Sequence, residues 1–506
     1  MAKILLLYQF YAPDDVVSAI EFTQLGEGLA AKGHVVEAWP SNRSCHQEDA
    51  VYTTKPEILN GVKVRRVWRP GFNQHLFWGR ILNALWVEAS WKIRALFTMN
   101  KPEVVIIGTD PIFAIFLAPF FRIFWPRTKI AHWCFDLYPD YAVAESMVTE
   151  KGFIVRFLRL FLKRIYPSCD LIADLGSCMR ERLEQYTEVK RTPTAPLTLP
   201  SPATDSARLT VRGEGNNGLK QTAPSSRPSP QMVSHVEPIE GEGEKSKPVK
   251  GVWKGITTKA VTLTPWALEE PAQPMAFDPE ERKLLFGGAK LGLLYSGNLS
   301  RPHRFDRTLE LARKLKGTTG VPQAADPHFE AAASSGFQDQ HNQTPHPGLR
   351  ARAQVVFAFS PRGNRTPELK AAIGPEDTHI HFAPFVSLDK LSARLSAPDI
   401  HIVSLRSAYT GVAVPSKFFG ALAVGRPVLF EGDDTSAIAR WIEEYKVGWV
   451  LNGKNLEVVA QQLIEFSNDA AAKEKMFSHC HEVYRVHFSK KFIVDEWDRQ
   501  LKTMLV

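Results

Sequence analysis

Short apolar runs, turns and helical stripes alternate along the first forty residues. Residues 3–8 form a continuous apolar run, as expected for a parallel strand that is buried on both faces. A helical stripe through Ile20, Leu25 and Leu29 ends at Gly33, a residue type that favours the position after a helix. A second strand is predicted at 35–39. This order of strand, helix and strand predicts the first unit of a doubly wound α/β domain.

The same pattern continues through both halves of the chain. Parallel strands of such domains carry ligands at their carboxyl ends, particularly where the strand order reverses. The predicted fold class is therefore α/β, with two Rossmann-like doubly wound domains that face each other across a cleft. Strands are expected at 104–108, 129–134, 171–175, 291–295, 355–359, 379–382, 400–403 and 427–430, and helices at 309–315, 435–445 and 455–466.

Two segments of biased composition interrupt this pattern. Residues 191–250 contain nine prolines and no Phe, Trp or Tyr, so they have too little apolar surface to offset the entropy of ordering. We predict a disordered insertion there and a shorter flexible insertion, rich in Gly, Pro, Gln, His and Ala, at 317–354. The expected domains are an N-terminal domain at 1–190, its end and a linker at 251–288, a C-terminal domain at 289–485, and a helix at 486–506 that crosses back to the N-terminal domain.

Composition excludes several classes of protein. The chain has 506 residues, 44% of them hydrophobic and 23% charged, which excludes a mainly disordered, collagen-like or coiled-coil protein. The 62 basic and 54 acidic residues give a net charge of +8, which suits an anionic ligand, an anionic membrane surface or nucleic acid. Five cysteines without a CxxC pair favour a reduced, cytosolic compartment. The longest apolar stretch, 111–121, is shorter than the ~20 residues that span a bilayer, and no signal peptide is expected.

A serine and a lysine mark the start of a predicted helix after residue 415. At a helix start, the hydroxyl of Ser416, the ammonium of Lys417 and free backbone N–H groups together suit a diphosphate. An ordinary capped helix with a surface lysine explains these two residues equally well. Both interpretations stay open on the residues alone.

Seven segments of the chain, taken in sequence order, form a recognisable set. They are the first strand with its turn at 8–13, then 32–35, 132–140, 264–267, 294–299, 415–417 and 488–489. Together they resemble the GT-B glycosyltransferases of family 4 (group 1), especially bacterial members that build surface polysaccharides. The resemblance covers nearly the whole chain outside the two insertions. It implies a retaining transferase whose C-terminal half binds a nucleotide-diphospho-sugar and whose N-terminal half binds the acceptor.

The resemblance also assigns roles to individual residues. On the donor side it implies backbone contacts with the donor phosphates, cations for the diphosphate, and a place for the nucleotide base. On the other side it implies that His132 contacts the transferred sugar, with Asp136 as a second catalytic candidate. Asp14 and Asp15 occupy the loop where the family meets the acceptor, although a simple turn explains them equally. The donor residues are Gly297, Asn298, Arg301, Arg362, Phe385, Val386, Ser416 and Lys417.

One departure from the family affects the donor site. The family's E-x7-E signature would place glutamates at about 412 and 420, where this chain has Val412 and Gly420. The second carboxylate usually holds the donor ribose, so donor affinity or specificity is expected to differ. This departure also motivates a rival hypothesis, a non-catalytic nucleotide-sugar-binding protein. A second rival is a nucleotide-sugar epimerase of the same fold.

No metal or cofactor is expected, because helix N-termini and basic side chains neutralise the leaving diphosphate. The run His479, Cys480 and His481 predicts a solvated helix rather than a metal site, since residues i and i+2 point to different sides of a helix.

Two amphipathic segments favour contact with a membrane. Residues 76–97 mix Trp and Leu with Arg80, Lys92 and Arg94, and residues 153–166 combine Phe157 and Phe161 with the cations Arg156, Arg159 and Lys163. Basic, aromatic helices of this kind bind anionic interfaces, although a core-facing helix with solvated cations is the alternative. Together the segments favour a lipid-linked saccharide acceptor and peripheral membrane association on the cytoplasmic side, rather than nucleic acid.

Overall fold

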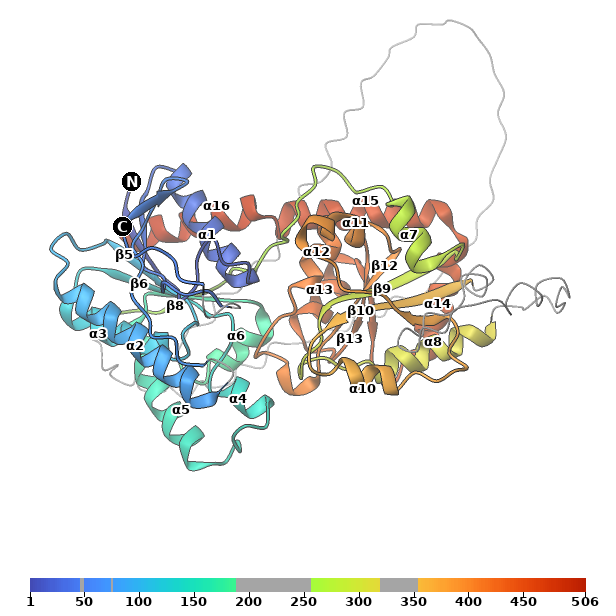
Figure 1. Ribbon diagram of the computed structural model, residues 1–506, viewed down its shortest axis with the longest axis horizontal. Helices are drawn as coiled ribbons and strands as arrows, with labels where there is room; N and C mark the ends of the chain where they lie inside the picture. The colour runs from blue at the N-terminus through green and yellow to red at the C-terminus, as the bar shows by residue number, and fades with distance from the viewer. Residues whose placement is uncertain (46–49, 74–75, 188–255, 319–353) are drawn as a thin grey trace, which may run out of the picture. The chain divides into compact units, whose positions relative to one another are not determined.

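The computed structural model describes residues 1–45, 50–73, 76–187, 256–318 and 354–506. All of these residues belong to one compact unit. The predicted insertion at 191–250 and most of the one at 317–354 lie outside the described residues. In the described part, two separate sheets form, one in each half of the chain (Figure 1).

The N-terminal sheet has eight strands in the order β3-β4-β2-β1-β5-β6-β7-β8. All neighbours are parallel except β3 and β4, and the central strand β1 is buried along nearly its whole length. Apolar residues from both faces of this sheet build the core of the N-terminal domain. The strands are β1 Lys3–Leu7, β2 Val35–Ala38, β3 Glu57–Leu59, β4 Val62–Val64, β5 Val104–Ile107, β6 Lys129–Trp133, β7 Leu171–Asp174 and β8 Lys259–Thr262.

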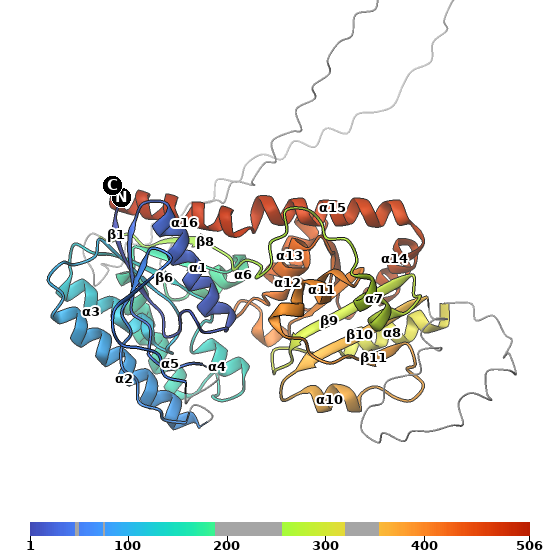
Figure 2. The same cartoon turned by 45° about the horizontal axis from the view of Figure 1, so that its top comes forward.

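Helices cover both faces of this sheet. Figures 1 and 2 both show α2, α3 and α5 on the side away from α1. The helix α1 ends before Gly33, whose positive φ of 86° is the conformation predicted for that glycine. The helices are α1 Val17–Ala31, α2 Phe77–Leu96, α3 Leu117–Phe124, α4 Asp140–Ala144, α5 Phe153–Ile165 and α6 Ser177–Leu183, with short 3₁₀ turns at Ala114–Phe116 and Tyr166–Ser168.

The C-terminal sheet has six parallel strands in the order β11-β10-β9-β12-β13-β14. Its strands are β9 Leu291–Asn298, β10 Val355–Arg362, β11 Ile380–Phe382, β12 Ile400–Ser404, β13 Val428–Glu431 and β14 Gly448–Leu451. Its helices are α7 Pro279–Phe286, α8 Asp306–Thr318, α10 Thr366–Ala371, α11 Leu391–Ser396, α12 Lys417–Ala423, α13 Ala437–Tyr445, α14 Leu456–Asn468 and α15 Ala470–His487. Two parallel, helix-flanked sheets confirm the predicted α/β class with two Rossmann-like domains.

The last helix, α16 (Lys490–Leu505), packs on the N-terminal domain although it follows the C-terminal one. Ser489 caps it, because its hydroxyl accepts a hydrogen bond from the N–H of Phe492 at 3.3 Å. The indole of Trp497 is fully buried, with its ring centroid 5.5 Å from that of Trp133. Figure 2 shows α16 lying beside α1, and the chain thus passes from the second domain back to the first.

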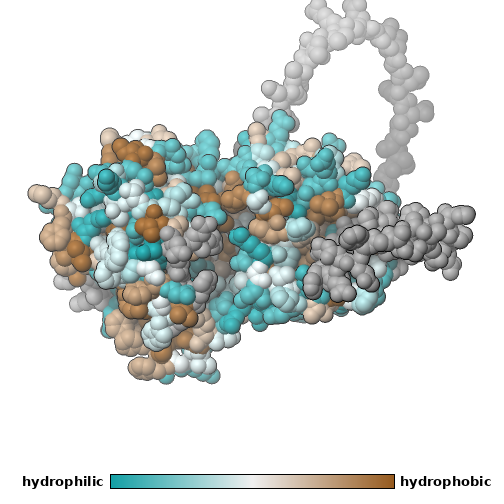
Figure 3. Space-filling view, viewed as in Figure 1, coloured by the Kyte–Doolittle hydropathy of each residue, from teal (hydrophilic) through white to brown (hydrophobic). Residues whose placement is uncertain are grey.

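The helices α2 and α5 expose more apolar surface than a core-facing helix does. On α2 the buried residues include Val87, Trp91 and Ala95, whereas Trp78 is 71% exposed. Figure 3 shows hydrophobic residues gathered over the region of α2 and α5. The exposed apolar residues of α2, α3, α5 and the chain after α2 are Trp78, Leu82, Leu85, Trp86, Ile93, Leu96, Phe97, Met99, Ile123, Phe124, Phe153, Ile154, Phe157, Leu160 and Phe161. We call this set the apolar face.

Two cations of the segments that are expected to contact a membrane are held by other parts of the protein. Arg159 forms an ion pair with the buried carboxylate of Asp140, with 2.7 Å between Nη2 and Oδ1. Arg94 donates hydrogen bonds to the backbone carbonyls of Arg65 and Arg66. These two cations are therefore engaged within the protein rather than free to meet an anionic surface. No helix in the described ranges is long and apolar enough to cross a bilayer.

Candidate active site

Two neighbouring strands of the C-terminal sheet end with the predicted donor residues. β9 and β10 pair in register up to Asn298 and Arg362, so both residues lie at the carboxyl edge of the sheet. Gly297, just before this edge, has a positive φ of 135°. A Cβ atom at this position would collide with the side chain of Lys417, which arrives from the start of α12. Glycine at 297 therefore allows the lysine to lie directly against the end of β9.

Two cations, Lys417 and Arg362, lie near each other at this edge. Burial, followed by the nearby guanidinium of Arg362, lowers the pKa of Lys417 to about 8. The Lys417 ammonium lies 5.2 Å from the ring centroid of Tyr295, and the guanidinium carbon of Arg362 lies 4.6 Å from that of Phe385. In the part of the chain that the structure describes, neither cation forms an ion pair with a carboxylate. Such a pair of cations suits an anion with more than one negative charge.

The other donor candidates lie on or beside the same segments. Asn298 contacts the loop after β10, since a Cβ atom at Gly363 would lie 2.7 Å from the Asn298 side-chain oxygen. Ser416 immediately precedes α12, and its hydroxyl makes no capping hydrogen bond. Val386 follows Phe385 and is partly buried, and its role stays a prediction. The structure thus places Lys417 against Gly297 and Arg362 against Phe385, at the ends of the two paired strands.

Arg301 lies in a different environment from these residues. Its guanidinium donates a hydrogen bond of 2.6 Å to the backbone carbonyl of Glu145 and lies 3.4 Å from the Glu145 carboxylate. The same carboxylate accepts a hydrogen bond of 2.7 Å from the hydroxyl of Tyr409. Arg301 is therefore engaged with the end of α4, and its role in donor binding stays a prediction.

His132 lies at the end of β6 in the N-terminal sheet and is almost completely buried. Its Nδ1 lies 2.9 Å from the backbone carbonyl of Ile107, so Nδ1 carries the proton and Nε2 keeps a lone pair. Burial lowers the pKa of this imidazole to about 4, which keeps it neutral at pH 7. A small cavity of about 20 Å³, lined by His132, Asp136 and Tyr138 among others, adjoins the ring.

Two carboxylates interact at this edge of the N-terminal sheet. Burial, followed by the charge of Asp110, raises the pKa of Asp136 to about 7. Burial also raises the pKa of Asp110 to about 6, against the opposing effect of Arg80 and Arg69. Sequence reasoning missed Asp110. The sequence did place Asp110 two residues after the strand predicted at 104–108, at the carboxyl end where ligands bind. Because β5 and β6 are parallel neighbours, their carboxyl ends lie at the same edge of the sheet.

Asp14 holds the first loop together. Its buried carboxylate accepts hydrogen bonds from the backbone N–H of Cys45 at 3.0 Å and from the hydroxyl of Tyr52 at 3.3 Å. Asp15, the next residue, is exposed. These contacts favour a structural role for Asp14, and a role of Asp15 in acceptor binding stays a prediction.

Positions 412 and 420, where the E-x7-E signature would place glutamates, have different surroundings. Val412 is fully buried, and its carbonyl accepts a hydrogen bond from the N–H of Leu137. Gly420 lies within α12, and a Cβ atom there would meet only Leu395, at 3.9 Å. A side chain would fit at 420, so the absence of a carboxylate there is not imposed by packing.

Of the run His479, Cys480 and His481, the last two residues are buried, whereas His479 is exposed. The Nδ1 of His481 donates a hydrogen bond of 2.8 Å to the carbonyl of Ala423, and Cys480 is fully buried. The predicted solvated helix is therefore wrong for both residues. Among the described residues, no group of three or more His, Cys, Asp or Glu side chains is arranged to hold a metal ion.

Two Rossmann-like domains, with a C-terminal helix that returns to the first one, define the GT-B fold. Three solved structures share it: sucrose-phosphate synthase from Thermosynechococcus elongatus (TM-score 0.58, 11% identity), the catalytic domain of starch synthase IV from Arabidopsis thaliana bound to ADP and acarbose (0.55, 10%), and α,α-trehalose 6-phosphate synthase from Burkholderia multivorans (0.54, 12%). Each match covers 100% of this chain and 99% of the other. No protein-family profile and no curated protein sequence matches the chain.

Proposed function

We propose that this protein is a retaining glycosyltransferase that moves a sugar from a nucleotide-diphospho-sugar to a saccharide acceptor, in the synthesis of a polysaccharide. The observation that carries the proposal is the pair Lys417 and Arg362 at the carboxyl edge of parallel strands, two cations close enough to influence each other's charge and with no ion pair to a carboxylate among the described residues. This is the position where open α/β sheets bind ligands.

The donor would bind with its diphosphate against these two cations. Lys417 acts as a point charge, and Arg362, oriented by its contact with the ring of Phe385, offers two parallel N–H groups. Both would neutralise the charge that develops on the diphosphate as the bond to the sugar breaks. The three structural neighbours support this reading as synthases of sugar compounds, and one of them was solved with ADP.

The acceptor and the transferred sugar would meet the edge of the N-terminal sheet. Neutral His132 offers the lone pair of Nε2 to a sugar hydroxyl, because its Nδ1 proton is already donated to the backbone. Asp136, with a pKa of about 7, is poised to take a hydrogen bond or a proton from an acceptor hydroxyl near neutral pH. Asp110 would act through Asp136, since its charge helps to set that pKa.

We also propose that the acceptor is lipid-linked and that the protein docks on the cytoplasmic side of an anionic membrane. The support is the apolar face of α2, α3 and α5, which exceeds the scattered exposed residues usual for a soluble surface. Arg156 and Lys163 are exposed on α5 beside Phe157 and Phe161. Apolar and basic side chains on one helix are typical of interfacial binding.

A donor panel tests the proposed transfer. The protein is titrated by calorimetry with UDP, GDP and ADP and their sugar conjugates, and nucleotide release is then followed with and without a membrane lipid extract as the acceptor source. Binding of one nucleotide sugar, with nucleotide release that depends on the extract, is expected. Interconversion of the free nucleotide sugars would instead indicate an epimerase, and binding without any turnover a non-catalytic binding protein.

A further inference from the structure

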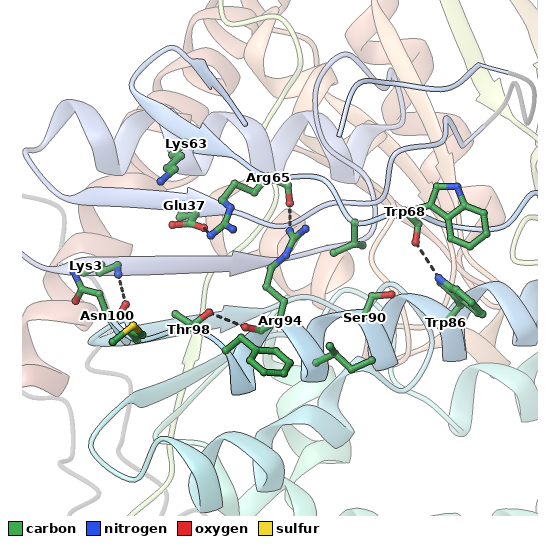
Figure 4. Close-up of a pocket in the computed structure, with 14 residues that line it drawn as sticks. Lys3, Glu37, Lys63, Arg65, Trp68, Trp86, Ser90, Arg94, Thr98 and Asn100 are labelled. Atoms are coloured by element: carbon green, nitrogen blue, oxygen red, sulfur yellow. Dashed lines mark hydrogen bonds and ion pairs between the residues drawn. The ribbon is translucent and has the colours of Figure 1, made fainter. Parts of the chain in front are cut away.

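A groove of about 740 Å³ lies between α2 and residues of the strand side: Lys3 at the start of β1, Glu37 on β2, Lys63 on β4 and Arg65 just after it (Figure 4). None of the proposed catalytic or donor residues lines it. Its walls differ in chemistry. Most charged side chains come from the strand side, with Arg94 added from α2. Aromatic and aliphatic side chains come mainly from α2 and the chain that follows it.

The strand side of the groove is mainly cationic. Lys63 lies opposite Glu37 in the register of β4 and β2, and the guanidinium of Arg65 lies 3.2 Å from the same carboxylate. Lys3 and Arg94 complete the charged lining, which gives four cations against one carboxylate. Arg94 is held by backbone carbonyls, whereas exposed Lys63 forms no hydrogen bond or ion pair within the described ranges. Lys63 is therefore the cation that is most available to an incoming anion.

The helix side of the groove is apolar and well ordered by its own contacts. Trp86 donates its indole N–H to the carbonyl of Trp68 at 3.1 Å, and the two rings pack edge to face with centroids 5.2 Å apart. Ile93 and Phe97 continue this wall, and Phe97 is 82% exposed. These residues also belong to, or border, the apolar face, so the groove opens directly onto it.

We propose that this groove binds an anionic amphiphile, a phospholipid whose phosphate lies at Lys63 and Arg65 and whose acyl chain lies along Trp86, Ile93 and Phe97. A soluble sugar or nucleotide would use the cations but not the aliphatic wall, and a neutral lipid would use the wall but not the cations. An amphiphilic anion matches both walls at once. This inference extends the membrane-docking part of the proposed function, so its test is made without a membrane.

The test uses lipids with chains too short to form vesicles. Dihexanoyl phosphatidic acid, below its critical micelle concentration, is titrated into the full-length protein by calorimetry, next to dihexanoyl phosphatidylcholine and inorganic phosphate. Binding of phosphatidic acid alone, or at least about tenfold more tightly than either comparator, is expected. Equally tight binding of inorganic phosphate would identify a site for free anions. Equally tight binding of the zwitterionic lipid would identify a purely apolar groove, and no binding of any of the three would show that the groove takes no lipid. Each of these results would overturn the proposal.

Matched variants locate the site. Lys63→Gln and Phe97→Ser change exposed side chains within the groove, and each should weaken phosphatidic acid binding by about fivefold or more. Lys55→Gln changes an exposed lysine and Ile123→Ser an exposed apolar residue, both outside the groove. These two control variants should leave the affinity unchanged. If the control variants lose as much affinity for phosphatidic acid as the groove variants do, the lipid binds elsewhere on the domain. Because Ile123 belongs to the apolar face, this comparison also separates the groove from general membrane contact.

Discussion

At the scale of the residue, the proposed donor binding depends first on the ammonium group of Lys417. Replacing Lys417 with Ala should weaken the binding of a nucleotide-diphospho-sugar by about 1.5–3 kcal/mol, because a charge-assisted contact with the diphosphate is lost. This corresponds to roughly 10- to 150-fold in the dissociation constant. Calorimetry on Lys417→Ala and on Lys454→Ala, an exposed lysine of the same domain, measures the difference. Equal affinities in the two variants would remove Lys417 from the donor site.

The shifted pKa of Lys417 gives a second prediction at this scale. With a pKa of about 8, the free ammonium loses its proton as the pH rises through 8, whereas a bound diphosphate favours the charged form. Donor affinity should therefore be constant below about pH 7 and fall above about pH 8, and binding at pH 8.5 should take up protons. Titrations in buffers of different ionisation enthalpy measure this uptake.

An arginine at position 417 provides the control, because a guanidinium keeps its proton throughout this pH range. Lys417→Arg should bind the donor without the proton uptake. If the wild-type protein takes up no protons at pH 8.5, then either another group meets the diphosphate or the lysine is more solvated than the structure shows.

At the scale of the element, α5 carries two arginines with opposite expected roles. Arg159 neutralises Asp140, which is buried and also accepts a hydrogen bond of 2.6 Å from the hydroxyl of Tyr186. Arg159→Glu should destabilise the protein by about 3 kcal/mol, because the buried carboxylate loses its closest cation and faces a like charge, which leaves it with Arg182 at 3.8 Å. Denaturant unfolding followed by circular dichroism measures this loss.

Arg156, three residues earlier on the same helix, is exposed and lies beside the apolar face. The double variant Arg156→Glu, Lys163→Glu should keep the wild-type stability but lose binding to anionic vesicles, at about 1 kcal/mol for each positive charge removed. Sedimentation with vesicles at low and high salt measures the binding, which added salt should weaken. Failure of the wild-type protein to sediment at low salt would show that the apolar face does not meet a bilayer.

Elements with strong local patterns were predictable from the sequence. The apolar runs at 3–8 and 104–108 became β1 and β5 within one residue, because a strand buried on both faces needs an unbroken apolar run. The short strands β3 and β4, and β14 with its partly buried residues, were missed, because pairing with neighbouring strands rather than local composition stabilises them.

The site was predictable only where a residue's role follows from its own segment. Gly297 and Lys417 stood out within motifs, whereas Asp110 matters because β5 lies next to β6. Arg159 was misjudged because its partner Asp140 lies on a different helix, 19 residues earlier. Contacts of this kind arise from tertiary packing and leave no periodic trace in the sequence.

At the scale of the whole molecule, the C-terminal helix α16 completes the core of the first domain. Trp497 is fully buried beside Trp133, so Trp497→Ala should cost about 3–5 kcal/mol of unfolding free energy through the cavity that it leaves. The indole N–H of Trp497 has no hydrogen-bond partner among the described residues, so Trp497→Phe should cost much less. Denaturant unfolding of both variants measures the two losses of unfolding free energy. Equal losses for Trp497→Ala and Trp497→Phe would indicate that the indole N–H does have a hydrogen-bond partner.

The proposed function requires that the chain binds the nucleotide sugar at its C-terminal sheet and that residues of its N-terminal sheet take part in transferring the sugar. The most direct measurement follows a radiolabelled sugar from its nucleotide donor into a membrane lipid extract, for the wild-type protein, Lys417→Ala and Asp136→Asn. The account predicts transfer by the wild-type protein, little transfer by either variant, and normal donor binding by Asp136→Asn alone. Transfer at the wild-type rate by both variants, or no transfer by the wild-type protein from any donor that it binds, would contradict it.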